Sequence, residues 1–288
     1  MTWKGLDESP GRIRELLASR GLALKKRWGQ NFMISGQARG RIVSELRVEK
    51  GELVWEIGPG LGSITALLLD RGARVAVFEV DYGLIGVIRE RFGDSVTVVE
   101  GDAVKTLPQA AGNPDRIAGN LPYRSAAAIV STILESERFS GVRRMVFTVQ
   151  REMARRMVAG PGASDYSPFS VLCSIAADAR LAGDLACGNF YPAPDVVSSV
   201  VVLEPRAVEP RLRRLASTAA RSLFAQRRKT VANNAGNLAA ALGAEREAVV
   251  GVLEEVGIEL SGRAETVSAD RFLELAGVLA ARGYSGLT

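Results

Sequence analysis

The chain of 288 residues carries a formal net charge of +5, is 47% hydrophobic, and contains two cysteines and no histidine. The lack of histidine excludes Ser-His-Asp and Cys-His catalysis and removes the commonest metal ligand, so we expect no metal site. The two cysteines lack CxxC spacing. The sequence contains no run of about 20 apolar residues that would span a membrane, and its N-terminal segment has no apolar core of the kind a signal peptide needs. We therefore expect a cytoplasmic protein.

A short amphipathic helix is predicted over residues 10–19. The segment after it places three cations, Lys25, Lys26 and Arg27, directly before the aromatic and amide side chains of residues 28–33. This mixture is typical of a loop that touches nucleic acid or lies over a cofactor. The alternative is a surface arm that its aromatic side chains anchor.

Residues 52–57 form the first predicted buried strand, and the glycine-rich turn of residues 58–62 separates it from a predicted helix over 63–70. A strand, a glycine-rich turn and a helix are typical of a nucleotide-binding βα unit. The spacing is GxGxG, with Ser63 where the dinucleotide fingerprint needs its last glycine. This spacing favours S-adenosylmethionine (SAM) over NAD, and the acidic Glu56 at the end of the strand fits the same interpretation.

Acidic residues follow the next two predicted strands, at residues 74–78 and 95–99. Glu79 lies about twenty residues after the glycine turn, where a carboxylate accepts ribose hydroxyls. Asp102 follows the third strand and is placed to accept the amino group of a cofactor adenine. A single acidic residue at the end of a strand is more often just a polar, solvent-exposed strand end than part of a site. The occurrence of such acids after two successive strands favours a cofactor site.

The segment Asn-Leu-Pro-Tyr, residues 120–123, is predicted on the turn between a fourth strand and a helix over 125–134. Open α/β sheets place their chemistry at such turns. The Asn120 side-chain oxygen and the Leu121 carbonyl offer two hydrogen-bond acceptors, and Tyr123 offers a stacking surface. These groups suit the exocyclic amino group of a purine. The alternative is a proline-terminated loop with a packed tyrosine.

Two stretches are rich in arginine and poor in acid, residues 138–156 and residues 206–229. The first holds six arginines against Glu152, and the second holds eight cations against Glu209. Clustered arginine of this kind predicts a surface for a polyanion. The alternative is a solvated helix face.

The remainder of the chain changes from strands to helices. A fifth strand is predicted over 145–149, an aromatic-proline loop around Phe190 precedes a strand over 196–203, and residues 204–210 are predicted to be a linker. Only helical patterns follow, at about 212–225, 230–242, 246–256 and 268–282. We therefore expect an α/β catalytic domain over residues 1–205 and a small all-helical domain over residues 206–288.

With these motifs in order, the chain resembles the family of small-subunit ribosomal RNA adenine dimethyltransferases, of the bacterial KsgA type. The matching segments span about residues 22–275 and are Gly29–Phe32, Glu56–Gly62, Gly101–Ala103, Asn120–Tyr123, Gln150–Glu152, Phe190–Pro194 and Phe224–Thr230. The resemblance implies a Rossmann-like, SAM-dependent methyltransferase sheet with a small helical C-terminal domain. It also implies dimethylation of two adjacent adenines near the 3′ end of the RNA, with the assembling small ribosomal subunit as partner.

The resemblance implies three sets of site residues. The catalytic set is Asn120, Leu121, Tyr123 and Phe190, with Phe190 and Tyr123 on opposite faces of the target base. The cofactor-binding set is Gln30, Asn31, Phe32, Glu56, Gly58, Gly60, Glu79, Asp102 and Asn120. The RNA-binding set is Lys25, Lys26, Arg27, Arg144, Arg151, Arg155, Arg221, Arg227, Arg228 and Lys229.

The chain departs from the family pattern at four positions. Arg124 follows Tyr123 where the family usually has Asn, Asp195 and Val197 stand where it often has Lys and Asp, and Met33 replaces a usual Leu. Arg124 has a consequence for function, because it would alter how the target base or its backbone is held. None of the four residues belongs to the predicted catalytic set.

Three other interpretations compete with this one. A large-subunit RNA adenine methyltransferase is disfavoured by the helical C-terminal domain, and an NAD enzyme by the GxGxG spacing. A non-catalytic RNA-binding assembly factor is disfavoured by the intact cofactor residues. We expect a monomer, because no surplus of apolar surface is evident in the sequence.

Overall fold

The computed structural model describes residues 9–22 and 30–285 and divides into two compact units. The first unit contains residues up to 133, 141–154 and 180–204, and the second contains residues 134–140, 155–179 and 205 onward. The last segment of the second unit begins at the predicted linker. Its other two segments, residues 134–140 and 155–179, were predicted to belong to the catalytic domain. Within the described residues, no helix is long and apolar enough to cross a membrane.

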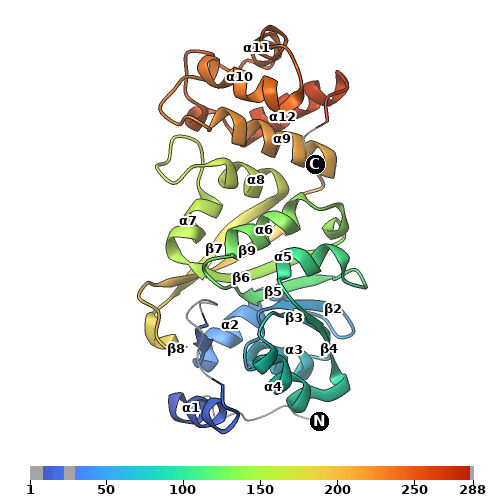
Figure 1. Cartoon of the computed structure of the whole chain (residues 1–288), viewed down its shortest axis with the longest axis vertical. Helices are drawn as coiled ribbons and strands as arrows, with labels where there is room; N and C mark the ends of the chain where they lie inside the picture. Colours follow the sequence, from blue (N-terminus) through green and yellow to red (C-terminus); the bar gives the residue numbers. More distant parts are fainter. Residues whose placement is uncertain (1–8, 23–29, 286–288) are drawn as a thin grey trace. The chain divides into compact units, whose positions relative to one another are not determined.

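A seven-stranded sheet, in the order β4-β3-β2-β5-β6-β9-β7, is the main element of the first unit (Figure 1). Strands β4 to β6 in this order are parallel, and β9 runs antiparallel to β6. The strands are β2 (Leu53–Ile57), β3 (Arg74–Glu79), β4 (Val96–Glu100), β5 (Arg116–Asn120), β6 (Arg144–Gln150), β7 (Ala177–Leu185) and β9 (Ser198–Pro205). A separate pair joins β1 (Phe32–Met33) to β8 (Phe190–Tyr191). This arrangement confirms the predicted α/β fold class.

The helices follow the strands in the alternation that parallel sheets require. They are α1 (Pro10–Ser19), α2 (Gly36–Leu46), α3 (Ser63–Asp70), α4 (Tyr82–Phe92), α5 (Ala103–Thr106), α6 (Ala126–Glu135) and α7 (Arg151–Val158). The chain order of the strands reverses direction between β2 and β5. Ligands bind outside the carboxyl ends of the strands at such a switch point, so this edge of the sheet is where a site is expected.

Apolar side chains on both faces of the sheet are buried, as expected for a parallel sheet that helices cover. On one face Val54 and Val77 join a core with side chains of α2 and α3, such as Ile42 and Leu68. On the other face the rings of Trp55 and Phe78 lie with their centroids 4.8 Å apart. These contacts pack β2 and β3, whose carboxyl ends lie beside the switch point, against the helices and against each other.

A buried ion pair lies at the amino-terminal edge of the sheet. The Glu52 carboxylate accepts hydrogen bonds from Nε and Nη2 of Arg116 at 3.0 and 3.1 Å, and both residues are buried. Glu52 also accepts the backbone N–H of Glu49 at 2.9 Å and pairs with Arg143. This bidentate pair joins β5 to the start of β2 away from the switch-point edge.

The second unit is helical and has its own core (Figure 1). Its helices are α8 (Pro168–Ala176), α9 (Pro210–Leu223), α10 (Val231–Leu242), α11 (Arg246–Glu255) and α12 (Ala269–Ala281). The Tyr166 ring meets Phe224 edge-on at 5.9 Å, and its hydroxyl donates to the Val267 carbonyl at 2.9 Å. The helical C-terminal region is confirmed, and α8 and β7 are elements that the sequence analysis did not predict.

Candidate active site

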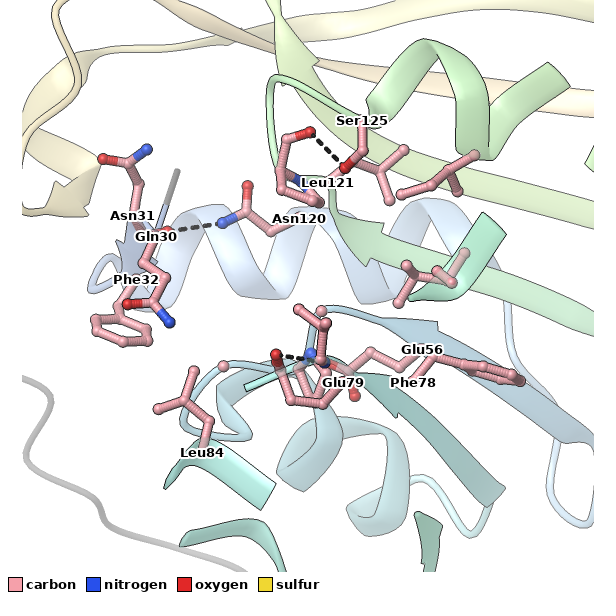
Figure 2. Close-up of a pocket in the computed structure, with 18 of the residues that line it drawn as sticks. Gln30, Asn31, Phe32, Glu56, Phe78, Glu79, Leu84, Asn120, Leu121 and Ser125 are labelled. Atoms are coloured by element: carbon pink, nitrogen blue, oxygen red, sulfur yellow. Dashed lines mark hydrogen bonds between the residues drawn. The ribbon is translucent and has the colours of Figure 1, made fainter. Parts of the chain in front are cut away.

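A cavity of about 270 Å³ opens at the carboxyl ends of β2, β3, β4 and β5, at the switch point of the sheet. Every residue of the predicted cofactor-binding set lines it, including Gly58 and Gly60 of the glycine turn, Glu79, Asp102 and Asn120. Asn120 and Glu79 enter it from opposite sides, and Phe32 closes a third side (Figure 2). The topology therefore brings together residues that are up to ninety positions apart in the chain.

The glycine turn after β2 has a conformation that only glycine adopts easily. Gly60 and Gly62 have φ values of +57° and +81°, and a Cβ on Gly62 would lie 2.3 Å from the Phe92 ring. A Cβ on Gly60 would lie 3.0 Å from the ring of Phe32. Arg91 of α4 holds the turn from outside by donating to the Leu61 carbonyl at 2.6 Å. The backbone is thus fixed against the pocket and leaves room for a ligand.

Glu56 lines the predicted cofactor pocket and also has a structural role. Its carboxylate lines the deep part of the pocket, is 1% exposed, and accepts the Thr65 hydroxyl of α3 at 2.5 Å. Burial raises the pKa of Glu56 to about 7, although the bonds from Thr65 act in the opposite direction. Glu56 therefore ties β2 to the first turns of α3 and supports the glycine turn between them.

Replacing Glu56 with Gln is expected to change how stability depends on pH. The folded chain holds the Glu56 proton more tightly than the unfolded chain, so this stabilisation is complete below pH 4.5 and is lost as the pH rises to about 7. Relative to Glu56→Gln, the wild type should lose about 3 kcal/mol of unfolding free energy over that interval. Urea unfolding at pH 4.5 and 7.5 measures this difference. Parallel pH profiles for the two proteins would contradict it.

Glu79 and Asp102 end successive strands on the same side of the pocket. Glu79 is 7% exposed, and its Oε1 accepts the N–H groups of Val80 and Asp81 at 2.8 and 2.9 Å. Burial raises its pKa, and these amide bonds oppose the rise. Asp102 is exposed and caps α5 by accepting the Val104 N–H at 3.0 Å. Both carboxylates are oriented by backbone amides, which leaves their remaining oxygens for a ligand.

The segment of Gln30, Asn31 and Phe32 forms a third wall of the pocket, to one side of Asn120 and Glu79 (Figure 2). The Gln30 amide donates to Oδ2 of Asp81 at 2.9 Å. Asp81 is 4% exposed and also caps α4 through the Gly83 N–H at 3.0 Å. Asp81 is a positioning residue that sequence reasoning missed, although it stands two residues after Glu79 in the same acidic strand end.

Asn120 is held so that its side-chain oxygen is left for a substrate. Its Nδ2 donates to the backbone carbonyl of Asn31 at 2.8 Å, which fixes the amide plane (Figure 2). The Leu121 N–H donates to the backbone carbonyl of Thr148 in the neighbouring strand at 3.0 Å, which fixes the next peptide. Within residues 30–285, no hydrogen bond is directed at Asn120 Oδ1 or at the Leu121 carbonyl. The two predicted acceptors therefore lie side by side with unused capacity.

Tyr123 lines the pocket, whereas Phe190 does not. The Tyr123 hydroxyl bonds the Ser198 hydroxyl at 2.8 Å, and burial raises the pKa of Tyr123. Phe190 is 2% exposed, pairs with Met33 across β1 and β8, and belongs to the core under the sheet. Because Phe190 is buried and does not line the pocket, the stacking of a base between Tyr123 and Phe190 stays a prediction. Ser198 was missed because it lies 75 residues from Tyr123 and has no local motif.

Arg144 was predicted to bind RNA, but its position argues against that role. It is 3% exposed, pairs with Glu204 of the adjacent strand β9, and donates to the Glu45 carbonyl at 3.2 Å. A guanidinium that is already buried and paired is not presented to a phosphate. We therefore leave Arg144 out of the RNA-binding surface.

The other predicted RNA-binding residues differ in how far their charges are already compensated. Lys25, Lys26 and Arg27 lie outside the described residues. Arg151 lies 3.9 Å from Asp184, Arg221 pairs with Glu135 at 2.7 Å, and Arg227 pairs with Glu265 at 2.8 Å. By contrast, Arg155, Arg228 and Lys229 are exposed and form no ion pair with the described part of the chain.

The turn that carries Arg228 and Lys229 joins α9 to α10, and hydrogen bonds from a buried side chain of α10 hold it in place. Asn234 is fully buried, accepts the Gln226 N–H at 3.1 Å, and donates to the Gln226 carbonyl at 3.2 Å. The Thr230 hydroxyl caps α10 by accepting the Asn233 N–H at 3.3 Å. This second unit thereby holds two uncompensated cations on a defined turn.

Several known proteins are similar to this chain over most of its length. The profile of the family described as ribosomal RNA adenine dimethylase matches residues 21–280. Ribosomal RNA small subunit methyltransferase A of Treponema denticola is 35% identical over 283 residues, which cover 94% of this chain and 95% of the relative. The protein of the same name from Myxococcus xanthus is 37% identical over 274 residues, which cover 92% and 93%.

Two solved structures share the fold at lower identity. A dimethyladenosine transferase from Plasmodium falciparum has a TM-score of 0.74 at 21% identity, covering 89% of this chain and 100% of that chain. The 23S rRNA methyltransferase ErmE has a TM-score of 0.62 at 23% identity, covering 87% and 100%. The profile match and the curated relatives extend over nearly the whole chain, and on that basis the chain belongs to the ribosomal RNA adenine dimethylase family.

Proposed function

We propose that this protein transfers methyl groups from SAM to the exocyclic amino groups of two adjacent adenosines near the 3′ end of small-subunit ribosomal RNA. The observation that carries the proposal is the fixed pair of acceptors, Asn120 Oδ1 and the Leu121 carbonyl, at the switch-point pocket. The small-subunit substrate is supported by the names of the curated relatives. An intact pocket favours an enzyme over a non-catalytic assembly factor.

The residues of the pocket fit SAM, whose sulfonium supplies an electrophilic methyl group. Because Gly60 has no side chain, a ligand can approach its backbone closely on one wall of the pocket, where a Cβ would contact the Phe32 ring. Glu79 would hold the ribose hydroxyls, and Asp102 would hold the adenine amino group. Glu79 and Asp102 place two carboxylates at this part of the pocket, which suits a ligand that carries positive charge.

Asn120 and Leu121 would activate the substrate by accepting the two N–H bonds of its amino group. This favours a pyramidal nitrogen, whose lone pair is otherwise delocalised into the purine ring. The acceptors are already oriented before substrate binds, so no reorganisation is needed during the reaction. Tyr123 would stack on the extruded base, which contributes roughly 1–3 kcal/mol. After the first transfer the remaining N–H still has an acceptor, and a second methylation uses the same site.

RNA binding is proposed to use the uncompensated cations of the second unit. Replacing both Arg228 and Lys229 with Ala should raise KM for small subunits and reduce the slope of log(kcat/KM) against log[salt] by about two. The paired Arg227 should have a smaller effect, because Glu265 already neutralises it. Lys50→Ala, at an exposed position at the amino end of β2, is the matched control. Equal salt slopes for the double variant and the control would contradict this proposal.

The experiment that tests the proposed function is a competition between ribosomal subunits. Small and large subunits lacking adenine dimethylation are incubated together with the protein and labelled SAM, and the subunits are then separated. Label in the small subunit alone is expected. Label in the large subunit would favour the alternative RNA substrate, and SAM binding without transfer would favour an assembly factor. The proposed cytoplasmic location follows from this substrate.

A further inference from the structure

Among the residues that line the pocket in the described part of the chain, Arg124 is the one that carries a positive charge. It follows Tyr123 directly on the turn between β5 and α6, and it is exposed. Within residues 9–22 and 30–285, its guanidinium forms no ion pair or hydrogen bond. The three pocket carboxylates instead come from the ends of β2, β3 and β4. The described lining of the pocket therefore has an acidic part and, beside Asn-Leu-Pro-Tyr, the cation of Arg124.

The two parts of the pocket are therefore suited to ligand groups of opposite charge. A cation suits the acidic part, and an anion suits the part beside Tyr123. A nucleotide whose base stacks on Tyr123 has its own phosphates one sugar away from that base, within the span of an arginine side chain. Arginine suits a phosphate in particular, because its planar guanidinium donates two parallel hydrogen bonds.

Arg151 offers a comparison at the same edge of the sheet. It follows β6, the strand next to β5, and its backbone N–H donates to the Val197 carbonyl at 3.0 Å. Val197 directly precedes Ser198, the partner of Tyr123. However, the Arg151 side chain lies 3.9 Å from Asp184, so part of its charge is compensated. Of these two arginines, Arg124 is the one that forms no ion pair with the described residues.

We propose that Arg124 binds a phosphate adjacent to the target adenosine and thereby positions the extruded base against Tyr123 and Asn120. The inference rests on the proposed RNA substrate and adds a positioning residue to it. The phosphate contact would be sequence-independent, so it would fix the register of the RNA in the pocket while Asn120 and Leu121 recognise the base. The competing assignment is the carboxylate of the SAM methionine group.

The test compares wild type, Arg124→Ala, Arg124→Lys and the control Arg71→Ala, an exposed arginine at the C-terminal end of α3. Methyl transfer to undermethylated small subunits is measured at several salt concentrations, and SAM affinity is measured by calorimetry without RNA. Arg124→Ala should raise KM for subunits about tenfold and reduce the salt slope of kcat/KM by about one. Its SAM affinity should stay within about twofold of wild type. Arg124→Lys should keep the salt slope, since the charge remains, and still show a raised KM, because the paired hydrogen bonds are lost.

Each other outcome has a definite meaning. An unchanged salt slope in Arg124→Ala overturns the phosphate contact. A SAM affinity that falls as much as kcat/KM assigns Arg124 to the cofactor and also overturns it. If wild type transfers methyl groups and Arg124→Ala behaves like Arg71→Ala, the inference fails while the proposed function stands. If wild type transfers nothing to small subunits, the proposed function fails and the inference fails with it.

Discussion

Replacing Asn120 with Ala is expected to lower kcat for methyl transfer by about 100- to 1,000-fold, the range found when one preorganised polar contact to a transition state is removed. Asn120 Oδ1 is the side-chain acceptor that the structure leaves for the amino group, and its geometry is set by the 2.8 Å bond from Nδ2 to the Asn31 carbonyl. SAM affinity should fall much less than kcat. The measurement pairs single-turnover transfer with calorimetric titration of SAM.

Asn120→Asp separates the two functions of this amide. It keeps an acceptor for the substrate but loses the N–H that binds the Asn31 carbonyl, so the Gln30–Phe32 segment loses its tie to β5. We expect weaker SAM binding and a smaller loss of kcat than in Asn120→Ala. Asn113→Ala, at an exposed position before β5, is the matched control. Full activity in Asn120→Ala would refute the proposed activation of the amino group.

Replacing Glu52 with Ala is expected to destabilise the fold by about 3–5 kcal/mol, because it leaves the buried Arg116 guanidinium without its partner. Burial disfavours the Glu52 carboxylate, but the bonds from Arg116 and from the Glu49 amide outweigh burial and lower its pKa. A group with a lowered pKa stabilises the folded state above its usual pKa, and this contribution is lost as the pH falls. Urea unfolding at pH 7 measures the loss directly.

Two further variants show whether the destabilisation comes from loss of the Glu52–Arg116 ion pair or from a general sensitivity of this region to substitution. The double change of Glu52→Leu with Arg116→Met removes both charges and should cost less than Glu52→Ala alone. Glu49→Ala, at an exposed side chain next to the pair, should stay within about 0.5 kcal/mol of wild type. A double variant as unstable as the sum of the single variants would show that Glu52 and Arg116 act independently.

The parts of the site that could be predicted are those in which one short segment determines both conformation and chemistry. The glycine turn is such a case, because the positive φ at Gly60 and Gly62 needs glycine wherever the turn lies. Asn120 and Leu121 are another, since the end of a buried strand fixes where they point. The successive strand-end acids were found for the same reason.

The parts that could not be predicted depend on contacts between distant segments. Arg144 looks like its basic neighbours in the sequence, and only the antiparallel β9 brings Glu204 to it. Phe190 is buried because β8 pairs with β1, which joins segments more than 150 residues apart. The strand β7 was missed because most of its side chains lie at least partly exposed and give no clear alternation. Burial of a residue of this kind is decided by topology, not by local sequence.

Identification of the methylated base is the decisive experiment for the proposed function. Small subunits lacking the modification are incubated with the protein and labelled SAM, and their RNA is digested to nucleosides and mapped. The account predicts N6,N6-dimethyladenosine at two adjacent positions near the 3′ end, and its absence with Asn120→Ala. Label on another base, or on a ring nitrogen of adenine instead of the amino group, would contradict the account.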